Sequence, residues 1–159
     1  MSQVKAKTLI EKMGYLDSDK KTPEHDKIQT WVYENARTII DELFVKGRFD
    51  YAILKNEWEY QVVTYNYQSK YIVGFVDIAV IIEKSDEKGD DYLRPRIFIE
   101  VKTKIPSLGE LLRQIKVYKT YLNNKNQAFV VVSPDDSHAN ILKKQDVFFY
   151  KYIDPEKLF

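Results

Sequence analysis

Residues 74–104 of the chain, GFVDIAVIIEKSDEKGDDYLRPRIFIEVKTK, decide the fold. Two apolar runs rich in β-branched residues flank a charged loop around Gly89, a pattern that predicts two strands. The first run contains Asp77, and the second contains Glu100 and Lys102. Because successive side chains of a strand point to opposite faces, Glu100 and Lys102 share a face, and Asp77 lies on the neighbouring strand of a predicted hairpin. We therefore expect two carboxylates and one ammonium group to converge on one face of a sheet.

This set of charges has two interpretations. Three buried charges are costly unless they pair or hold a metal ion. Carboxylates and a backbone carbonyl suit Mg²⁺ or Mn²⁺, and they leave positions for water and a phosphate oxygen. Such a cation would acidify the attacking water and stabilise the developing charge, while Lys102 would orient that water, so the set favours phosphodiester hydrolysis. The structural alternative is an Asp–Lys or Glu–Lys salt bridge at the strand ends.

The remaining sequence predicts an α/β fold with a mixed central sheet flanked by helices. Thr22 and Pro23 open the first helix as N-cap and first helical residue, and Ser107 with Glu110 forms a capping box for a later one. After a short helix and a loop within residues 1–21, we expect a helix at 23–45, strands at 58–67, 71–82 and 96–102, a helix from 107 to about 122, a strand at 127–133, a short helix near 137–144 and a strand at 147–152. The first three strands would form a meander, and the fourth would return after a helix.

Composition limits the class of protein. The length of 159 residues fits a single domain, 1–159, and the hydrophobic fraction of 44% supplies a core. The absence of cysteine excludes disulfides and zinc–thiolate sites. No run approaches the roughly 18–20 apolar residues of a membrane span, and no signal peptide is recognisable, so we expect a soluble, cytoplasmic protein with no membrane partner.

Charge is segregated along the chain although the net charge is only +1. Basic residues concentrate between 94 and 125, where two acids stand against eight bases: Arg94, Arg96, Lys102, Lys104, Arg113, Lys116, Lys119 and Lys125. The loop just before them is acidic. A basic patch on the folded surface is therefore compatible with nucleic-acid binding despite the balanced total.

The strand motifs, together with Gln114-x-x-x-Tyr118 on the next helix, resemble the PD-(D/E)XK nuclease superfamily, closest to its RecB-like and Cas4-like branch with a QxxxY motif. The resemblance covers about residues 22–134 and includes the α-β-β-β-α-β order of that core. It leaves 1–21 as an N-terminal extension and 135–159 as a C-terminal helix and strand. Val76 stands where the motif name has proline.

The resemblance implies a metal site. Asp77, Glu100 and the carbonyl of Val101 would hold Mg²⁺ or Mn²⁺, and Lys102 would be the catalytic lysine. His25 lies on the inward stripe of the first helix and is similar to a histidine that joins the metal in the RecB-like branch. The alternative for His25 is a helix-end histidine bonded to a backbone carbonyl.

The resemblance also implies a nucleic-acid partner. Gln114 and Tyr118 would contact nucleic acid or position the lysine, although core packing explains Tyr118 equally well. Arg113, Lys116 and Lys104 could reach the phosphate backbone, and a solvated helix face is the alternative. The expected activity is that of a metal-dependent deoxyribonuclease acting on DNA, and a homodimer would allow two strands to be cut. The other candidates are a nucleic-acid-binding module of the same fold without chemistry, and a structural α/β domain with an ion-pair network.

Overall fold

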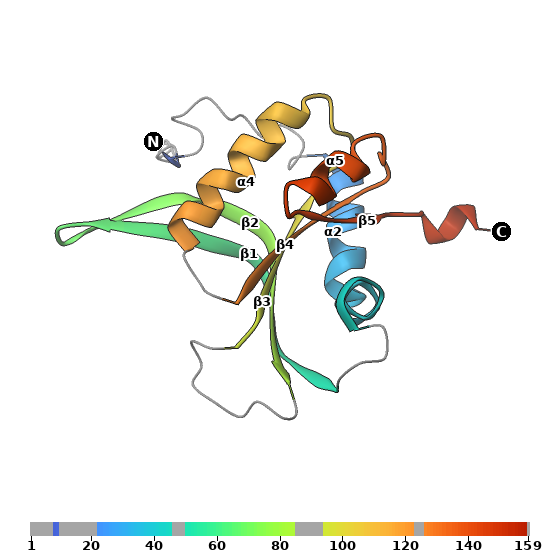
Figure 1. Ribbon diagram of the computed structural model, residues 1–159, viewed down its shortest axis with the longest axis horizontal. Coiled ribbons are helices and arrows are strands. Elements are labelled where there is room, and N and C mark those ends of the chain that lie inside the picture. The colour runs from blue at the N-terminus through green and yellow to red at the C-terminus, as the bar shows by residue number, and fades with distance from the viewer. Residues whose placement is uncertain (1–7, 10–21, 46–49, 85–93, 123–125, 159) are drawn as a thin grey trace, which may run out of the picture.

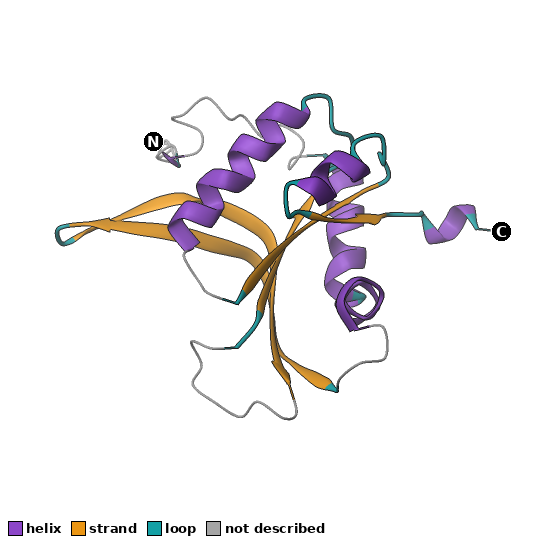
Figure 2. Cartoon of the chain, viewed as in Figure 1, coloured by secondary structure: helices purple, strands orange, loops and turns teal. Residues whose placement is uncertain are grey.

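The computed structural model describes residues 8–9, 22–45, 50–84, 94–122 and 126–158 (Figures 1 and 2). The expected short helix and loop within residues 1–21 and the charged loop around Gly89 lie mostly outside these ranges.

A five-stranded mixed sheet forms the centre of the fold, in the spatial order β1-β2-β3-β4-β5. The first three strands are antiparallel neighbours, whereas β4 is parallel to β3 and β5 is parallel to β4. The strands are β1 (Tyr51–Asn66), β2 (Ser69–Lys84), β3 (Arg96–Val101), β4 (Gln127–Ser133) and β5 (Phe148–Lys151). The α/β class and the order of elements predicted from the sequence are confirmed.

Helices cover both faces of the sheet and create two hydrophobic cores (Figure 1). On one face, α2 (Pro23–Glu34) and α3 (Ala36–Ile40) pack against alternate strand residues such as Ile78 and Ile99. On the other face, α4 (Leu108–Leu122) and α5 (Ala139–Lys144) pack against the intervening residues, such as Ala79 and Phe98. Along β3, and along β2 from Ile78 onward, the period of two thus assigns each buried apolar side chain to one core, whereas Val73 and Val76 both join the second core because the alternation of β2 is shifted before that point.

The first helix is shorter than predicted. It begins as expected, because the Thr22 side chain accepts the backbone N–H of His25 at 3.2 Å and Pro23 follows. It ends at Glu34, because Asn35 leaves helical geometry (φ −120°, ψ 27°) and donates from its side chain to the carbonyl of Trp31 at 2.8 Å. Asparagine competes for backbone groups in this way. The predicted helix at 23–45 is therefore wrong as a single element: α2, α3 and a π-helical turn (Asp41–Val45) replace it.

The β1–β2 hairpin is longer than predicted. Both strands have 16 residues and join through Tyr67 and Gln68, whereas the sequence predicted strands at 58–67 and 71–82. The added part of β1 carries Lys55 and Glu57, which form an ion pair on its exposed side. These charged residues interrupt the alternation of apolar and polar residues that predicts a strand. Pairing with β2, rather than the local sequence, therefore extends the strand.

The end of α5 is a Schellman motif. The backbone N–H of Val147 donates to the carbonyl of Leu142 at 3.0 Å, and that of Asp146 donates to Lys143 at 3.2 Å. Asp146 has φ 58°, a left-handed conformation that glycine adopts without steric cost. The motif turns the chain directly into β5, and Leu142 and Val147 join the same core.

We expect Asp146→Gly to stabilise the protein by about 0.5–1 kcal/mol, because glycine removes the Cβ strain at this position. The neighbouring Gln145 is a matched control, since its φ is −100° and Gln145→Gly should destabilise. Urea denaturation of both variants checks this, and a loss of stability in Asp146→Gly would contradict it.

Candidate functional site at the divergence of β2 and β3

The two central antiparallel strands separate at the acidic residues. The last described pair of the β2–β3 ladder joins Ile78 to Ile99. Beyond it, β3 remains paired with β4 through Val101 opposite Val132. The backbone N–H of Val101 donates instead to the side chain of Asp77, at 2.7 Å from Oδ2. A carboxylate therefore takes the place of a ladder hydrogen bond where β3 leaves β2.

Strand β1 is also irregular at this level. The pairs Trp58–Ile78 and Tyr60–Val76 place Glu59 opposite Asp77, and Glu59 has φ 52°. A non-glycine residue with positive φ is uncommon and is often found at functional sites. The two strands beside Asp77, β1 and β3, thus both depart from regular pairing with β2 at this level.

Two side chains of α2 reach this point. His25 is fully buried, and its Nε2 lies 3.1 Å from the carbonyl oxygen of Val101 and 3.4 Å from Oδ2 of Asp77. Both neighbours are acceptors, so Nε2 carries the proton in this arrangement. Gln29 donates from Nε2 to the backbone carbonyl of Asp77 at 3.0 Å. The helix therefore holds both strands at the divergence.

His25 makes the backbone contact that was the alternative to metal ligation. Ligation through Nε2 would require the ring to exchange its bond to Val101 for one to a cation, because a metal ligand nitrogen carries no proton. A role for His25 as a ligand remains a prediction.

The donor set fits a hard divalent cation. Asp77 and Glu100 are 1% and 2% exposed and lie at neighbouring positions of adjacent strands. With the carbonyl of Val101 they supply the oxygen ligands that Mg²⁺ and Mn²⁺ prefer. Within the described ranges, however, no three His, Asp or Glu side chains are grouped closely enough to form a complete metal site as they stand. Lys102 follows directly after β3 and is half-buried.

The predicted residues of α4 divide into a buried and an exposed pair. Gln114 and Tyr118 are 6% and 2% exposed, and the Tyr118 hydroxyl donates to the carbonyl of Phe75 on β2 at 3.2 Å. Arg113 and Lys116 are exposed. Burial favours a positioning role for the first pair over direct contact with nucleic acid, whereas the second pair is accessible to a phosphate backbone.

The segment after β3 is anchored to the β4–α5 loop. Asp135 accepts the backbone N–H of Ile105 at 2.9 Å and both the hydroxyl and the N–H of Ser137. The Ser137 hydroxyl bond, followed by the Ile105 N–H, lowers the pKa of the Asp135 carboxyl. This anchor fixes the turn that carries Lys102 and exposed Lys104.

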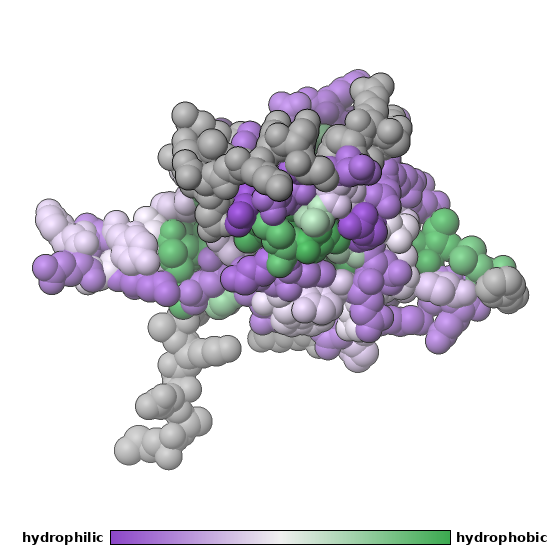
Figure 3. Space-filling view, turned by 90° about the horizontal axis from the view of Figure 1, so that it is seen from below, coloured by the Kyte–Doolittle hydropathy of each residue, from purple (hydrophilic) through white to green (hydrophobic). Residues whose placement is uncertain are grey.

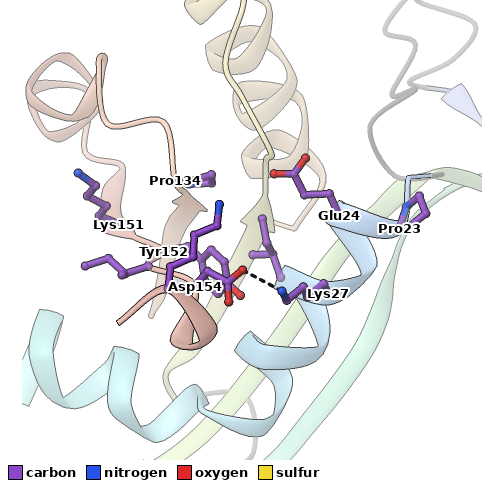
Figure 4. Close-up of a pocket in the computed structure, with 10 residues that line it drawn as sticks. Pro23, Glu24, Lys27, Pro134, Lys151, Tyr152 and Asp154 are labelled. Carbon is purple, nitrogen blue, oxygen red and sulfur yellow. Dashed lines mark hydrogen bonds and ion pairs between the residues drawn. The ribbon is translucent and has the colours of Figure 1, made fainter. Parts of the chain in front are cut away.

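A cavity of about 670 Å³ opens beside α2, between its first turn and the C-terminal segment (Figure 4). Lys27 on its wall bonds to Asp154 at 2.8 Å, and this bond raises the pKa of Lys27 and lowers that of Asp154. Residues of α2 line the cavity, and the same helix contacts the point where β2 and β3 separate. Asp77 and Glu100 do not line the cavity. The bonds of Lys27 to Asp154 and Glu156 attach the C-terminal turn (Pro155–Lys157) to α2 beside this cavity.

Two contributors to the site, Gln29 and Asp135, were missed from the sequence, and Glu59, which lies opposite Asp77, matched no motif in it. Gln29 had a usable signal, since it lies four residues after His25 on the buried stripe of the first helix, where an amide needs a partner. Asp135 acts through its bond to the backbone of Ile105, a contact between residues far apart in the sequence that no local pattern predicts.

Comparison with known proteins supports the fold. No protein-family model and no curated protein matches the sequence. Among solved structures, the chain is similar to a repair endonuclease from Pyrococcus abyssi, with a TM-score of 0.51 and 19% sequence identity over 89% of this chain. The match spans 51% of that chain, so this chain corresponds to about half its length. At this identity the likeness shows a shared fold.

No helix in the described part of the chain has the length and hydropathy needed to cross a bilayer.

We expect Gln29→Leu to lower the free energy of unfolding by about 1–3 kcal/mol, because the buried carbonyl of Asp77 loses its side-chain donor. Thr30→Val is a control on the exposed face of the same helix and should change stability by no more than about 0.5 kcal/mol. Denaturant unfolding measures both, and equal stability of the two variants would contradict a structural role for Gln29.

Proposed function

We propose that the chain is a metal-dependent nuclease of the PD-(D/E)XK type that hydrolyses phosphodiester bonds of DNA. The observation that carries this proposal is the pair of buried carboxyls, Asp77 and Glu100, at the point where β2 and β3 diverge. Lys102 follows one residue beyond β3, and the fold is similar to that of a repair endonuclease. Burying two acids that had no such function would lower the stability of the protein without a compensating benefit.

The residues have distinct roles in this proposal. Asp77, Glu100 and the carbonyl of Val101 would hold Mg²⁺ or Mn²⁺. When bound, the cation supplies Lewis-acid stabilisation of the phosphate and a more acidic water. Lys102 orients the attacking water and balances the charge of the scissile phosphate.

Supporting residues fix the geometry. Gln29 holds the backbone of Asp77, and the bond between Asp77 and Val101 sets the separation of the two strands. Tyr118 braces β2 from the other face through Phe75. Preorganised groups of this kind lower the cost of reaching the transition state.

Exposed cations on α4 and after β3 suit a phosphate backbone. Arg113 and Lys116 on α4 and Lys104 after β3 are exposed cations, and they would bind DNA outside the reacting centre. A homodimer remains a further proposal, because cutting both strands of a duplex needs two sites.

A second candidate is a nucleic-acid-binding module of the same fold without chemistry. The bonds of His25 and Asp77 to the backbone of Val101 favour it, because a purely structural site would use its polar groups in this way.

We expect purified protein to cleave DNA with Mg²⁺ or Mn²⁺ and not with EDTA. Lys102→Ala, Asp77→Asn and Glu100→Gln should each lower the rate by at least about 100-fold, since each removes a group that stabilises developing charge. Lys144→Ala, an exposed lysine on α5, is the control and should cleave as wild type. Supercoiled plasmid, linear duplex, single-stranded DNA and RNA are the substrates; a Lys102→Ala variant with full activity would refute the mechanism.

Metal binding has an independent test in thermal denaturation. Mn²⁺ at about 100 times its dissociation constant should stabilise the wild type by about 2.7 kcal/mol and raise its Tm. Glu100→Gln should weaken this effect, and Glu110→Gln, an exposed acid on α4, should not. Cation binding without cleavage would favour the binding module, and an unchanged Tm would refute the metal site.

A further inference from the structure

The outer end of the β1–β2 hairpin projects beyond the rest of the sheet (Figures 1 and 3). This end, residues 63–72, is called the arm below. Its strands pair from Val63 opposite Ile72 to Asn66 opposite Ser69. Three tyrosines of the arm are exposed: Tyr65 by 67%, Tyr67 by 99% and Tyr71 by 46%.

The fold does not explain these rings. Single exposed aromatic residues are ordinary, but three at the end of one short hairpin are a local concentration that needs an explanation. In the register of the arm, Tyr65 stands opposite Lys70, and Tyr71 stands opposite Thr64. The two tyrosines therefore lie on opposite faces, with Tyr67 between them at the tip. Rings on both faces and at the tip cannot all pack against one element of the same chain.

Among the three tyrosines, Tyr67 gives the strongest indication of a role in binding. Its φ of 56° is a left-handed conformation, and hairpin turns place glycine, asparagine or aspartate there. Tyrosine is unfavourable in this left-handed conformation. The ring of Tyr67 is almost fully exposed, so packing does not offset this cost. A residue that strains the backbone without stabilising the fold points to a role in binding.

The charge of the arm indicates which class of molecule it binds. Residues 60–76 contain no Asp or Glu, although the chain has 24 acids among 159 residues, and Lys70 is the sole charge of this stretch. Such a surface does not repel phosphates. Its other exposed side chains include Asn66, Gln68 and Ser69, which are polar and do not supply the apolar core of a stable protein interface. Aromatic rings with a nearby cation instead suit unpaired bases, which stack on them regardless of sequence.

Strand β2 runs from the arm to the candidate site, with one register shift against β1 at Val73. Tyr71 and Asp77 lie six residues apart on it, which is about 20 Å at roughly 3.3 Å per residue. At about 3.4 Å per nucleotide along the axis of duplex DNA, this distance corresponds to roughly six base pairs between the cleaved bond and the unpaired segment. Between them, Phe75 is tied to α4 through the Tyr118 hydroxyl, so the strand keeps a fixed course.

We propose that the arm binds single-stranded DNA by stacking bases on Tyr65, Tyr67 and Tyr71, and that it holds unpaired nucleotides about six positions from the cleaved bond. The placement of the cut rests on the nuclease function proposed above, whereas the binding of single strands does not. The substrate is then a DNA with a single-stranded segment beside the site, such as a flap, a gap or a splayed end.

Fluorescence anisotropy with a labelled oligothymidylate of about 20 nucleotides, in EDTA, tests the binding without cleavage. Tyr67→Gly removes the ring and relieves the backbone, so its affinity should fall about 5- to 150-fold while its Tm stays equal or rises. Tyr65→Ser should lose affinity and Tyr65→Phe should keep it, because stacking needs the ring and not the hydroxyl. Ile141→Ser, an exposed apolar residue on α5, is the control and should bind as wild type.

Wild-type affinity in both Tyr67→Gly and Tyr65→Ser would overturn the proposal. So would a loss of self-association in these variants, measured by light scattering, with DNA binding unchanged, since the arm would then be a protein interface. If the wild type cleaves no substrate but ring-dependent binding is observed, the nuclease proposal fails and the binding role of the arm stands. If cleavage is observed and mapped on a flap substrate, a cut about six nucleotides from the single-stranded segment supports the placement, and a cut at an unrelated distance refutes it.

Discussion

The hydrogen bond from the Val101 N–H to the Asp77 carboxylate is the constraint on which this molecule depends. A backbone N–H in the middle of a sheet must find a partner, and β3 takes this group away from β2. A side-chain acceptor at position 77 lets the two strands separate without an orphaned donor. The same bond fixes a carboxyl at the divergence, beside Glu100 and Lys102. One interaction therefore opens the sheet and places an acid in the opening.

Helix α2 converts that opening into a rigid arrangement. Its buried face supplies His25 to the carbonyl of Val101 and Gln29 to the carbonyl of Asp77, so each strand is bonded to the helix. Its exposed face holds the C-terminal turn through Lys27 and Asp154. Chain segments far apart in sequence thus meet on one helix. The fold shared with an endonuclease describes this frame, but chemistry must be argued from the side chains it carries.

Sequence reasoning succeeded where the signal was local and failed where a distant contact decided. Alternation along β2 and β3 located Asp77 and Glu100 on neighbouring strands, and the Thr22 cap located the first helix, because both patterns lie within a few residues. The interruption at Asn35 is an exception, since its cause is a side-chain bond to the carbonyl of Trp31 only four residues away. The positive φ of Glu59, by contrast, occurs within the paired β1 strand and is a property of the folded chain. Whether Asp77 and Glu100 hold a cation stays a prediction, as does the role of His25.

Among the described strands, β1 lies at one edge of the sheet, and an edge strand of 16 residues is a surface to which another molecule can add a strand. The charged pair of Lys55 and Glu57 and the left-handed backbone at Glu59 interrupt the regular row of donors and acceptors that such an addition requires. The irregular backbone opposite Asp77 therefore has a second consequence, which concerns association between copies of the chain rather than chemistry at the site. Both features oppose edge-to-edge pairing of this long hairpin with copies of the chain.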